Sequence, residues 1–225
     1  EAPAFDLKFL WEQEVGDGVY RLLGESRSGW LPSYVHENLK MVPDGVEGMA
    51  ARFEGDGYVV FDHHEELGAG RRLTIEVWVK PEHFSLGLPY TIVEKGGAEG
   101  RFNYLLDVIP STADYGWLRL SLMDNDCSDV ISSRGLFNNP PIVAGRWHHV
   151  LVSFDGLHVK MIVTQVAEGG YVSILNGGES YLGPNIDLCE KSDPLWIGAR
   201  FEDGIMQKFF HGEMDDLQIY TSSAR

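Results

Sequence analysis

Apolar and polar residues alternate along several short runs of the chain, and a period of two is the pattern of a half-buried β-strand. Looser versions of this pattern lie between the clear ones. The clear runs are Leu7–Trp11, Leu73–Val79, Leu118–Leu122, Val150–Phe154, Val159–Val163 and Leu217–Ile219, and the looser ones are Tyr58–Phe61, Tyr104–Val108, Tyr171–Leu175 and Leu195–Ile197. The pattern predicts about ten to twelve strands.

Dipeptides that favour tight turns separate these runs, among them Gly96-Gly97, Asp155-Gly156 and Gly169-Gly170. Glycine supplies the positive φ angles that hairpin turns need. No window repeats apolar residues at helical spacing over several turns, and the best helical candidate is the short segment Asp62–Leu67. The chain is therefore predicted to be all-β, an antiparallel two-sheet β-sandwich rather than a parallel α/β sheet. We expect the less regular Gly24–Gly48 to form a long ordered loop or an edge segment.

The chain has 225 residues and shows no internal repeat or linker-like change of composition, so we expect residues 1–225 to form a single domain. Its 18 basic and 34 acidic residues give a formal net charge of −16. Such a charge repels nucleic acid phosphates and anionic membrane surfaces, which excludes nucleic acid as an expected partner and disfavours polyanionic ligands. Because no apolar stretch is long enough to cross a bilayer, we also expect no membrane insertion.

Two further features bear on the compartment. The first residues, Glu1-Ala2-Pro3, lack the basic and apolar segments of a signal peptide. A mature secreted protein or an excised domain would lack them too, so this feature does not argue for the cytoplasm. Cys127 and Cys189 are too few for a disulfide framework and lack the spacing of a metal site. A bridge between them suits an extracytoplasmic β protein but not a cytosolic one, and the sequence leaves the pairing open.

Four segments of the chain carry motifs that occur together, in this order, in one family. They are Ala51–Val59 (ARFEGDGYV), Leu73–Pro81 (LTIEVWVKP), Gly145–Val150 (GRWHHV) followed by Phe154–Gly156, and Leu195–Gly198 (LWIG) followed by Phe210–Tyr220 (FHGEMDDLQIY). Through them the sequence resembles a laminin-G-like domain of the concanavalin A-like lectin/glucanase superfamily. The resemblance implies a concanavalin A-like jelly roll. One departure is a longer segment, Val166–Gly178, in place of the family's short hairpin, so the loops that face a ligand need not follow the family.

Enzymes with this fold often carry the pattern E-x-D-x-x-E on one strand, because alternation puts the carboxylates on one face for glycosidase chemistry. The corresponding string here runs from Glu213 through Asp215 to Gln218. Gln218 can neither protonate a leaving group nor act as a nucleophile, so the strand lacks the pair that a retaining glycosidase needs. No nucleophile elbow is present either, and we expect no catalytic residues.

Two other groups of polar residues are poor candidates for metal sites. Asp124–Asp129 is rich in oxygen ligands, but Asp129 stands where an EF-hand loop requires glycine, which favours a solvated turn. Adjacent histidines on a strand point to opposite faces, so neither His63-His64 nor His148-His149 can chelate one ion. We expect one member of the second pair to pack under the sandwich and the other to lie outside.

Asp215 is the carboxylate that most needs a partner. Strict alternation places it on the same side of its strand as Leu217 and Ile219, where an ionised group must be paired, hydrogen-bonded or bound to a cation. The resemblance to the family implies a structural Ca²⁺ here, with further ligands from the first strand and its turn, around Glu12 and Gly16. Such oxygen ligands suit Ca²⁺. The alternative is a carboxylate that accepts backbone N–H groups without a metal.

Most aromatic residues lie in strand registers and are expected to pack in the core, Trp196 among them. Aromatic residues in loops are different, because a sugar ring stacks its apolar face on an exposed aromatic plane. The candidates for ligand binding are Trp30, Tyr34, Tyr90, Tyr115 and Trp117. For each of them, packing in the core is the alternative.

These observations favour a non-catalytic carbohydrate-binding, lectin-like domain, extracytoplasmic and belonging to, or acting beside, a polysaccharide-active protein. Its expected partners are carbohydrates, neutral rather than polyanionic, and other domains of a longer polypeptide. Because one fold serves many functions, two alternatives stay open. One is an adhesion or scaffolding module that binds protein through an exposed apolar patch, and the other is a polysaccharide lyase or glycosidase with its site in a concave groove.

Overall fold

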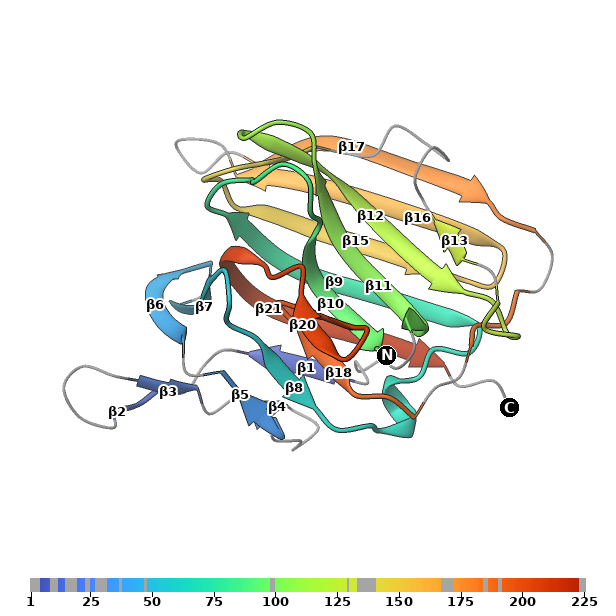
Figure 1. Ribbon diagram of the computed structural model, residues 1–225. Coiled ribbons are helices and arrows are strands. Elements are labelled where there is room, and N and C mark those ends of the chain that lie inside the picture. The colour runs from blue at the N-terminus through green and yellow to red at the C-terminus, as the bar shows by residue number, and fades with distance from the viewer. Residues whose placement is uncertain are drawn as a thin grey trace.

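The computed structural model in Figure 1 describes residues 5–8, 12–14, 20–22, 25–26, 32–36, 38–46, 48–97, 100–128, 130–132, 141–166, 172–183, 186–189 and 192–222. These residues form two large antiparallel β-sheets. The segment Asp62–Leu67, the helical candidate of the sequence, contains a 3₁₀ turn, Glu65–Leu67. The predicted all-β, antiparallel two-sheet sandwich is confirmed, and its arrangement is consistent with a jelly roll. No helix in the described ranges has the length and apolar character needed to cross a membrane.

The two large sheets contain nine and eight strands. The nine-stranded sheet contains, side by side, β17 (Val172–Tyr181), β16 (His158–Val166), β15 (His148–Phe154), β9 (Arg72–Pro81), β21 (His211–Ser222), β1 (Phe5–Lys8) and β4 (Glu25–Ser26), with β7 (Gly48–Glu54) paired to β21 and β6 (Leu39–Gly45) paired to β7. The eight-stranded sheet contains β13 (Val130–Ser132), β12 (Tyr115–Met123), β11 (Phe102–Pro110), β10 (Tyr90–Gly96), β18 (Leu195–Ile197), β8 (Val59–Phe61) and β5 (Tyr34–Val35), with β14 (Pro141–Val143) paired to β12. Two small hairpins join β2 (Glu12–Glu14) to β3 (Tyr20–Leu22) and β19 (Arg200–Glu202) to β20 (Ile205–Gln207).

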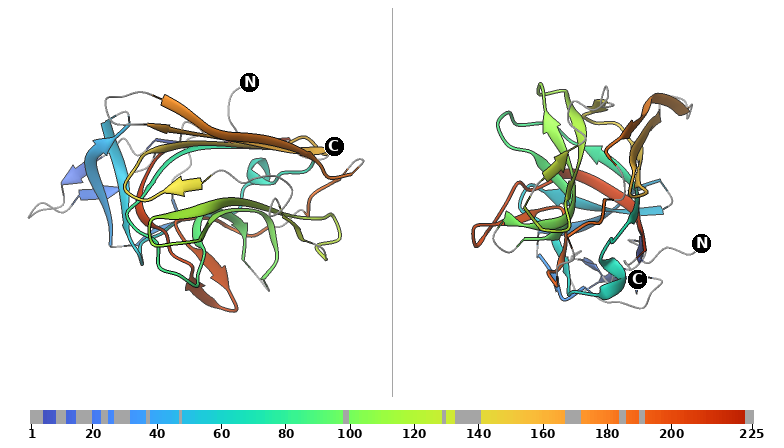
Figure 2. Two further views of the ribbon diagram at one scale, coloured as in Figure 1. Left: turned by 90° about the horizontal axis from the view of Figure 1, so that it is seen from above. Right: turned by 90° about the vertical axis from the view of Figure 1, so that its right-hand side faces the viewer.

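The large sheets lie as two layers with a hydrophobic core between them (Figure 2). In β9, Leu73, Ile75, Val77 and Val79 are buried and the residues between them are half-buried. β15 and β16 alternate in the same way. This is the pattern of strands that place one face on a core, and the alternating runs that predicted these three strands are confirmed.

β10 is a strand that the sequence pattern misses, because both of its faces are covered. All seven of its residues are buried. Ile92 and Val93 belong to the core, whereas Thr91 and Glu94 face away from it. The hairpin β19–β20 lies over that outer side (Figure 2). There the Phe201 N–H donates to Glu94 Oε2 at 3.2 Å. A strand covered on both faces has no alternation to detect.

Alternation in β21 is interrupted by a β-bulge. The register against β9 shifts by one residue after Asp215, and Asp216 has a φ of 48°, in the left-handed region. Met214 is in the core before the bulge and Leu217 after it. The prediction that Asp215 lies on the same side as Leu217 is therefore wrong: the extra residue places Asp215 on the outer side of the sheet, opposite Trp78.

Candidate functional site

A continuous row of aromatic side chains follows the β18, β8 and β5 edge of the eight-stranded sheet, on the side away from the core. We call it the aromatic strip, and it consists of Tyr34, His36, Tyr58, Trp196, Phe201 and Phe209. Tyr58 is at its centre. The ring centroid of Tyr58 is 5.1 Å from that of His36 and 5.5 Å from that of Tyr34. It is 6.3 Å from the centroids of both Trp196 and Phe209.

Strand alternation and one glycine position the middle of the strip. Trp196 stands between two core residues of β18, so its indole points outward, and its Nε1–H donates to the Gly96 carbonyl at 2.8 Å. Phe201 stacks on it, with ring centroids 5.3 Å apart and planes inclined by 10°. Gly198, at φ 82°, turns the chain from β18 toward the hairpin. A Cβ at Gly198 would lie 2.3 Å from the ring of Phe53, so only glycine allows this path.

The rings of the strip are half-buried or exposed, and Tyr34 is 48% exposed. Large aromatic side chains that stay partly in solvent present planar apolar faces beside polar groups. Burial raises the pKa of Tyr58, and the neighbouring Tyr34 adds to the shift. The Tyr58 phenol therefore stays protonated at neutral pH and can donate a hydrogen bond.

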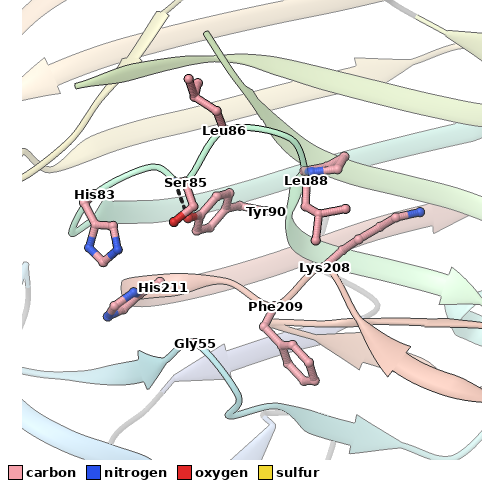
Figure 3. Close-up of a pocket in the computed structure, with 10 residues that line it drawn as sticks. Gly55, His83, Ser85, Leu86, Leu88, Tyr90, Lys208, Phe209 and His211 are labelled. Carbon is pink, nitrogen blue, oxygen red and sulfur yellow. Dashed lines mark hydrogen bonds between the residues drawn. The ribbon is translucent and has the colours of Figure 1, made fainter. Parts of the chain in front are cut away.

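A pocket of about 270 Å³ lies beside Phe209, and we call it the rim pocket (Figure 3). It is formed by the loop between β9 and β10, the segment before β21 and the turn after β7. Its lining consists of Gly55, His83, Ser85, Leu86, Leu88, Pro89, Tyr90, Lys208, Phe209 and His211. The Ser85 N–H donates to the Tyr90 hydroxyl at 2.7 Å, which ties the loop to the start of β10. Because Phe209 belongs to both features, the rim pocket and the aromatic strip form one surface.

The charged groups around the rim pocket are balanced by neighbours of opposite sign. The rings of His83 and His211 meet edge to face with centroids 4.4 Å apart, and Glu82 Oε2 is 3.4 Å from His211 Nε2. Burial lowers the pKa of His211, and His83 lowers it further. Lys208 forms an ion pair with Glu202. The pocket thus offers polar groups with little net charge, an environment that suits hydroxyls better than carboxylates.

A buried ionic contact fixes the hairpin β19–β20, which carries Phe201. Arg200 Nε lies 3.2 Å from Glu94 Oε1, and both side chains are almost completely buried. Burial raises the pKa of Glu94 to about 7, although the Arg200 charge acts in the opposite direction. Since the Phe201 N–H donates to the same carboxylate, the hairpin and its aromatic ring are held against the sheet.

The aromatic residues predicted to bind a ligand lie on two separate surfaces. Tyr34 belongs to the aromatic strip, and Tyr90 lines the rim pocket but is only 6% exposed, so it offers little open ring face. Tyr115 and Trp117 contact each other on β12, with centroids 5.5 Å apart. Four strands separate β12 from β5 in the sheet, so Trp117 is about 24 Å from Tyr34 at the usual strand spacing. Trp30 is outside the described residues.

Most of the aromatic strip is not predicted by the sequence pattern. The expectation that Trp196 packs in the core is wrong, because the core-facing residues of β18 are its two neighbours. Alternation along Leu195-Trp196-Ile197 carries that signal, since the middle residue of such a triplet must face outward. The hairpin β19–β20 carries Phe201 to the strip, and the segment after it carries Phe209. The order of apolar and polar residues around them predicts neither contact.

The structure places Asp215 within hydrogen-bond reach of two backbone amides. The Val46 N–H donates to Oδ2 and the Asp216 N–H to Oδ1, both at 2.9 Å. In the described ranges, no three His, Cys, Asp or Glu side chains gather as a group that could hold a metal ion. Gly16 and the side chain of Glu12 are not among the described parts. The described residues fit the hydrogen-bonded carboxylate, and Ca²⁺ at Asp215 stays a prediction.

The other acid of this strand, Glu213, is engaged by two basic side chains. Arg52 Nη1 lies 3.2 Å from its Oε1 and Lys80 Nζ 3.0 Å from its Oε2. Both carboxylate oxygens of Glu213 are thus engaged by side chains of neighbouring strands. Glu213 therefore has the surroundings of a structural carboxylate.

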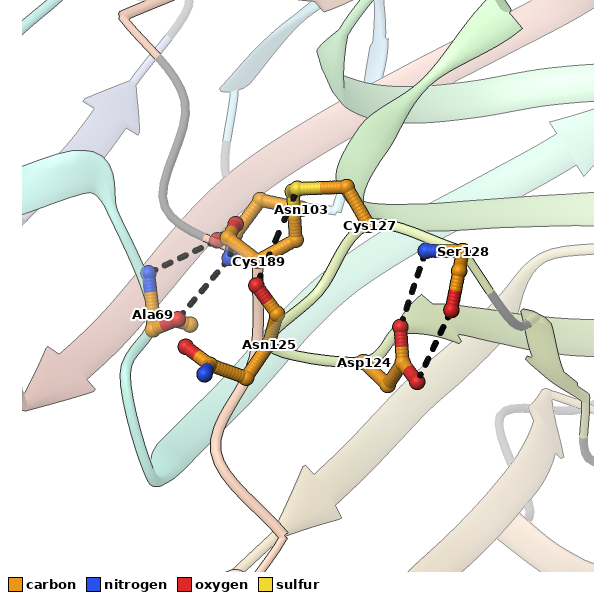
Figure 4. Close-up of a disulfide and its surroundings, with 7 residues drawn as sticks. All are labelled: Ala69, Asn103, Asp124, Asn125, Cys127, Ser128 and Cys189. Atoms are coloured by element: carbon orange, nitrogen blue, oxygen red, sulfur yellow. Dashed lines mark hydrogen bonds between the residues drawn. A yellow bond between two sulfur atoms is a disulfide. The ribbon is translucent and has the colours of Figure 1, made fainter.

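The acidic run near Cys127 forms a turn, as expected. The Ser128 N–H donates to Asp124 Oδ1 at 3.0 Å (Figure 4). Cys127 is joined to Cys189 by a disulfide with a Cα–Cα distance of 5.2 Å, which answers the question that the sequence left open. Asn103 Nδ2–H donates to the Cys189 carbonyl at 2.6 Å and so holds the buried end of the bridge.

The two histidines of β15 divide as predicted, one inside and one outside. His148 is fully buried, its Nδ1 bonds the Arg146 carbonyl at 2.8 Å, and its Nε2 accepts the Val143 N–H at 3.2 Å. Burial lowers the pKa of His148 to about 4. His149 is half-buried on the outer side and pairs with Glu76 at 2.7 Å. Both are structural in these positions.

The sandwich topology and the motifs along its strands define the class of the protein. Residues 53–224 match the concanavalin A-like lectin/glucanases superfamily, and the chain belongs to that family. The resemblance recognised in the sequence is thus confirmed. No curated protein matches the chain.

Solved structures with the same fold come from proteins of several kinds. Domain 4 of AbnA, a GH43 extracellular arabinanase from Geobacillus stearothermophilus solved in complex with arabinotriose, is 18% identical with a TM-score of 0.58, and the match covers 89% of this chain and 88% of that one. The binding domain of botulinum neurotoxin serotype D is 11% identical with a TM-score of 0.56, over 100% of this chain and 49% of that one. Tailspike protein 2 of Escherichia coli O157:H7 bacteriophage CAB120 is 10% identical with a TM-score of 0.56, over 86% and 26%. The chain thus spans about half of the neurotoxin domain, and these likenesses concern the fold alone.

Proposed function

We propose that this chain is a non-catalytic, lectin-like domain that binds neutral carbohydrate on the surface formed by the aromatic strip and the rim pocket. The observation that carries the proposal is the strip itself, a row of partly exposed rings whose central member, Tyr58, contacts four others. Sugar rings have apolar faces that stack on such planes and hydroxyls that bond to the groups between them. The strip and the pocket together supply both kinds of contact.

The charge of the surface favours a neutral ligand. The protein carries a formal net charge of −16, and the ammonium group of Lys208, which lines the pocket, is paired with Glu202. A polyanionic glycan would meet overall repulsion with no local excess of positive charge to offset it. Neutral hydroxyls are indifferent to the net charge and can bond to imidazole, ammonium and phenol groups.

Two observations support an extracytoplasmic setting beside a polysaccharide-active protein. The Cys127–Cys189 disulfide is a bond of oxidising compartments. The arabinanase domain with this fold belongs to an extracellular enzyme and was solved with an oligosaccharide. We place the present chain in the same kind of setting, as a binding domain rather than as the catalytic unit.

A glycan array, probed with and without Ca²⁺, tests the proposal. We expect signals on neutral glycans and none on sulfated or polyuronic ones. An empty array under both conditions would contradict the proposal and favour the adhesion module. That alternative has one observation in its support, because Leu86 and Leu88, on one loop, are 69% and 58% exposed.

A further inference from the structure

The shape of the rim pocket bears on how a glycan enters it. In Figure 3, His83 and His211 lie on one side, Leu88 and Lys208 on the opposite side, and Phe209 below. Leu86 lies above them, and the nearly buried Tyr90 lies in the middle. The lining residues lie around the pocket in this view, and the pocket is partly open to solvent. Its volume, about 270 Å³, is below the range usual for drug-sized ligands and suits one sugar ring.

The aromatic strip begins at one wall of this pocket. Phe209 lines the pocket and lies 6.3 Å from Tyr58, centroid to centroid, and Tyr58 lies 5.5 Å from Tyr34. On the side of His83 and His211, by contrast, the wall leads to the charged group that contains Glu82. Stacking surface for further sugar units is therefore found on the Phe209 side.

We infer that the rim pocket receives the terminal unit of a neutral glycan chain, end-on, and that the following units leave over Phe209 toward Tyr58 and Tyr34. This inference rests on the proposed function. The polar groups at the pocket suit a chain end, which carries more free hydroxyls than an interior unit. The Nε2 of His211 faces Glu82, which leaves Nδ1, on the side of Gly55, for a ligand hydroxyl. The Ser85 hydroxyl can both donate and accept a hydrogen bond.

Binding to chain ends and binding to chain interiors differ in stoichiometry. An end-binding domain attaches the same number of protein molecules to each chain whatever its length, whereas an interior-binding domain attaches more as the chain grows. The test is calorimetric titration of the protein with linear arabino-, xylo- and cello-oligosaccharides of increasing length and with their parent polymers. We expect a constant number of protein molecules per chain end for the series that binds.

Ser85→Phe provides an independent test, because Ser85 is exposed and a phenyl ring there fills the pocket while the backbone bond to Tyr90 is retained. Ser192→Phe is the matched control, since this exposed serine lies near the Gly96 end of β10, away from Tyr90. We expect Ser85→Phe to weaken binding about tenfold or more without changing the melting temperature, and Ser192→Phe to bind as the native protein does.

The outcomes separate the inference from the proposed function. A number of bound molecules that rises with chain length, or native affinity in Ser85→Phe, would overturn end-on capture while carbohydrate binding stands. A native protein that binds none of the three series and gives an empty glycan array would overturn both.

Discussion

The indole N–H of Trp196 donates to the Gly96 carbonyl, and Phe201 covers one face of its ring. A ring held in this way loses little conformational freedom when a ligand approaches it, so less of the contact energy is offset by ordering. Tyr34, at the other end of the strip, is 48% exposed and contacts Tyr58 and His36 through its ring. At the scale of single residues, the strip thus combines fixed rings with an accessible one.

The first prediction concerns Ca²⁺ binding at Asp215 and its effect on the melting temperature. If the carboxylate holds Ca²⁺ as well as two N–H groups, the ion stabilises the native state by mass action, and EDTA should lower the melting temperature. In Asp215→Asn, the amide nitrogen faces one of the two backbone donors and one hydrogen bond is lost. This variant should melt lower than the native protein by the equivalent of about 1 to 3 kcal/mol, and EDTA should have no further effect on it.

The measurement is a pair of thermal melts, with and without EDTA, for each protein, together with elemental analysis. A native melting curve that EDTA leaves unchanged, in protein that contains no metal, would contradict the calcium prediction. Asp215 would then be held by hydrogen bonds without a metal, those from Val46 and Asp216 among them.

At the scale of elements, His148 on β15 makes the free energy of unfolding depend on pH. Its Nε2 accepts the Val143 N–H, so protonation of that nitrogen would break the bond inside a buried site. The pKa of His148 in the folded state is lowered to about 4 from 6.5, so the unfolded chain takes up the proton first as the pH falls. We expect the free energy of unfolding to be unaffected by this group above pH 6.5 and to fall by on the order of 3 kcal/mol between pH 6.5 and 4.

Denaturant unfolding across that pH range measures the effect, with His148→Gln and His149→Gln as a matched pair. The first variant should flatten the dependence on pH, because glutamine cannot take up a proton. The second variant removes a histidine from the half-buried outer side of the same strand and so controls for the substitution itself. Equal slopes in all three proteins would show that His148 titrates normally.

The disulfide links the turn after β12 to the segment before β18, two places separated by 62 residues in the sequence. Closing a loop of that length restricts the unfolded chain and stabilises the fold by roughly 4 kcal/mol in the chain-entropy account. The double variant Cys127→Ser, Cys189→Ser should therefore lose stability of that order, measured by denaturant unfolding. A loss below about 1 kcal/mol would indicate that the loop is already ordered without the bridge.

At the scale of the whole molecule, the charge of −16 predicts a specific response to salt. Binding of a neutral glycan by stacking and hydrogen bonds changes no ion pairs, so its affinity should stay within about twofold as the ionic strength rises. Titrations of the strongest array ligand at low and high salt measure this. A steep loss of affinity with salt would mean that the ligand is anionic and is recognised by charge.

The sandwich could be predicted from the sequence where one face of a strand meets the core and the other meets solvent. β9 is such a strand, and the alternation of apolar and polar residues from Leu73 to Val79 is sufficient to predict it. β10 could not be found in this way because both of its faces are buried, and the side of β21 on which Asp215 lies changed with a bulge that alternation cannot show. That residues 1–225 form a single domain stays a prediction.

The candidate site was predicted only in part, for a physical reason. Tyr34 was identified because it lies in an irregular segment rich in aromatic residues. The contacts of Tyr58 with Trp196 and Phe209 join positions far apart in the chain, and each depends on strand order and on the path of the hairpin β19–β20. The sequence shows a glycine at position 198, where this path begins, but it does not show where the hairpin packs.

The most direct test of carbohydrate binding at the aromatic strip compares Tyr34→Ala with Trp117→Ala, two exposed aromatic residues of the same sheet, 48% and 39% exposed. Calorimetry with the strongest array ligand should give the native protein a Kd of about 10⁻⁵ to 10⁻³ M. Tyr34→Ala should weaken that affinity by about 1 to 2 kcal/mol, and Trp117→Ala should leave it unchanged. Loss of binding in Trp117→Ala together with native affinity in Tyr34→Ala would contradict the account and place the ligand on β12.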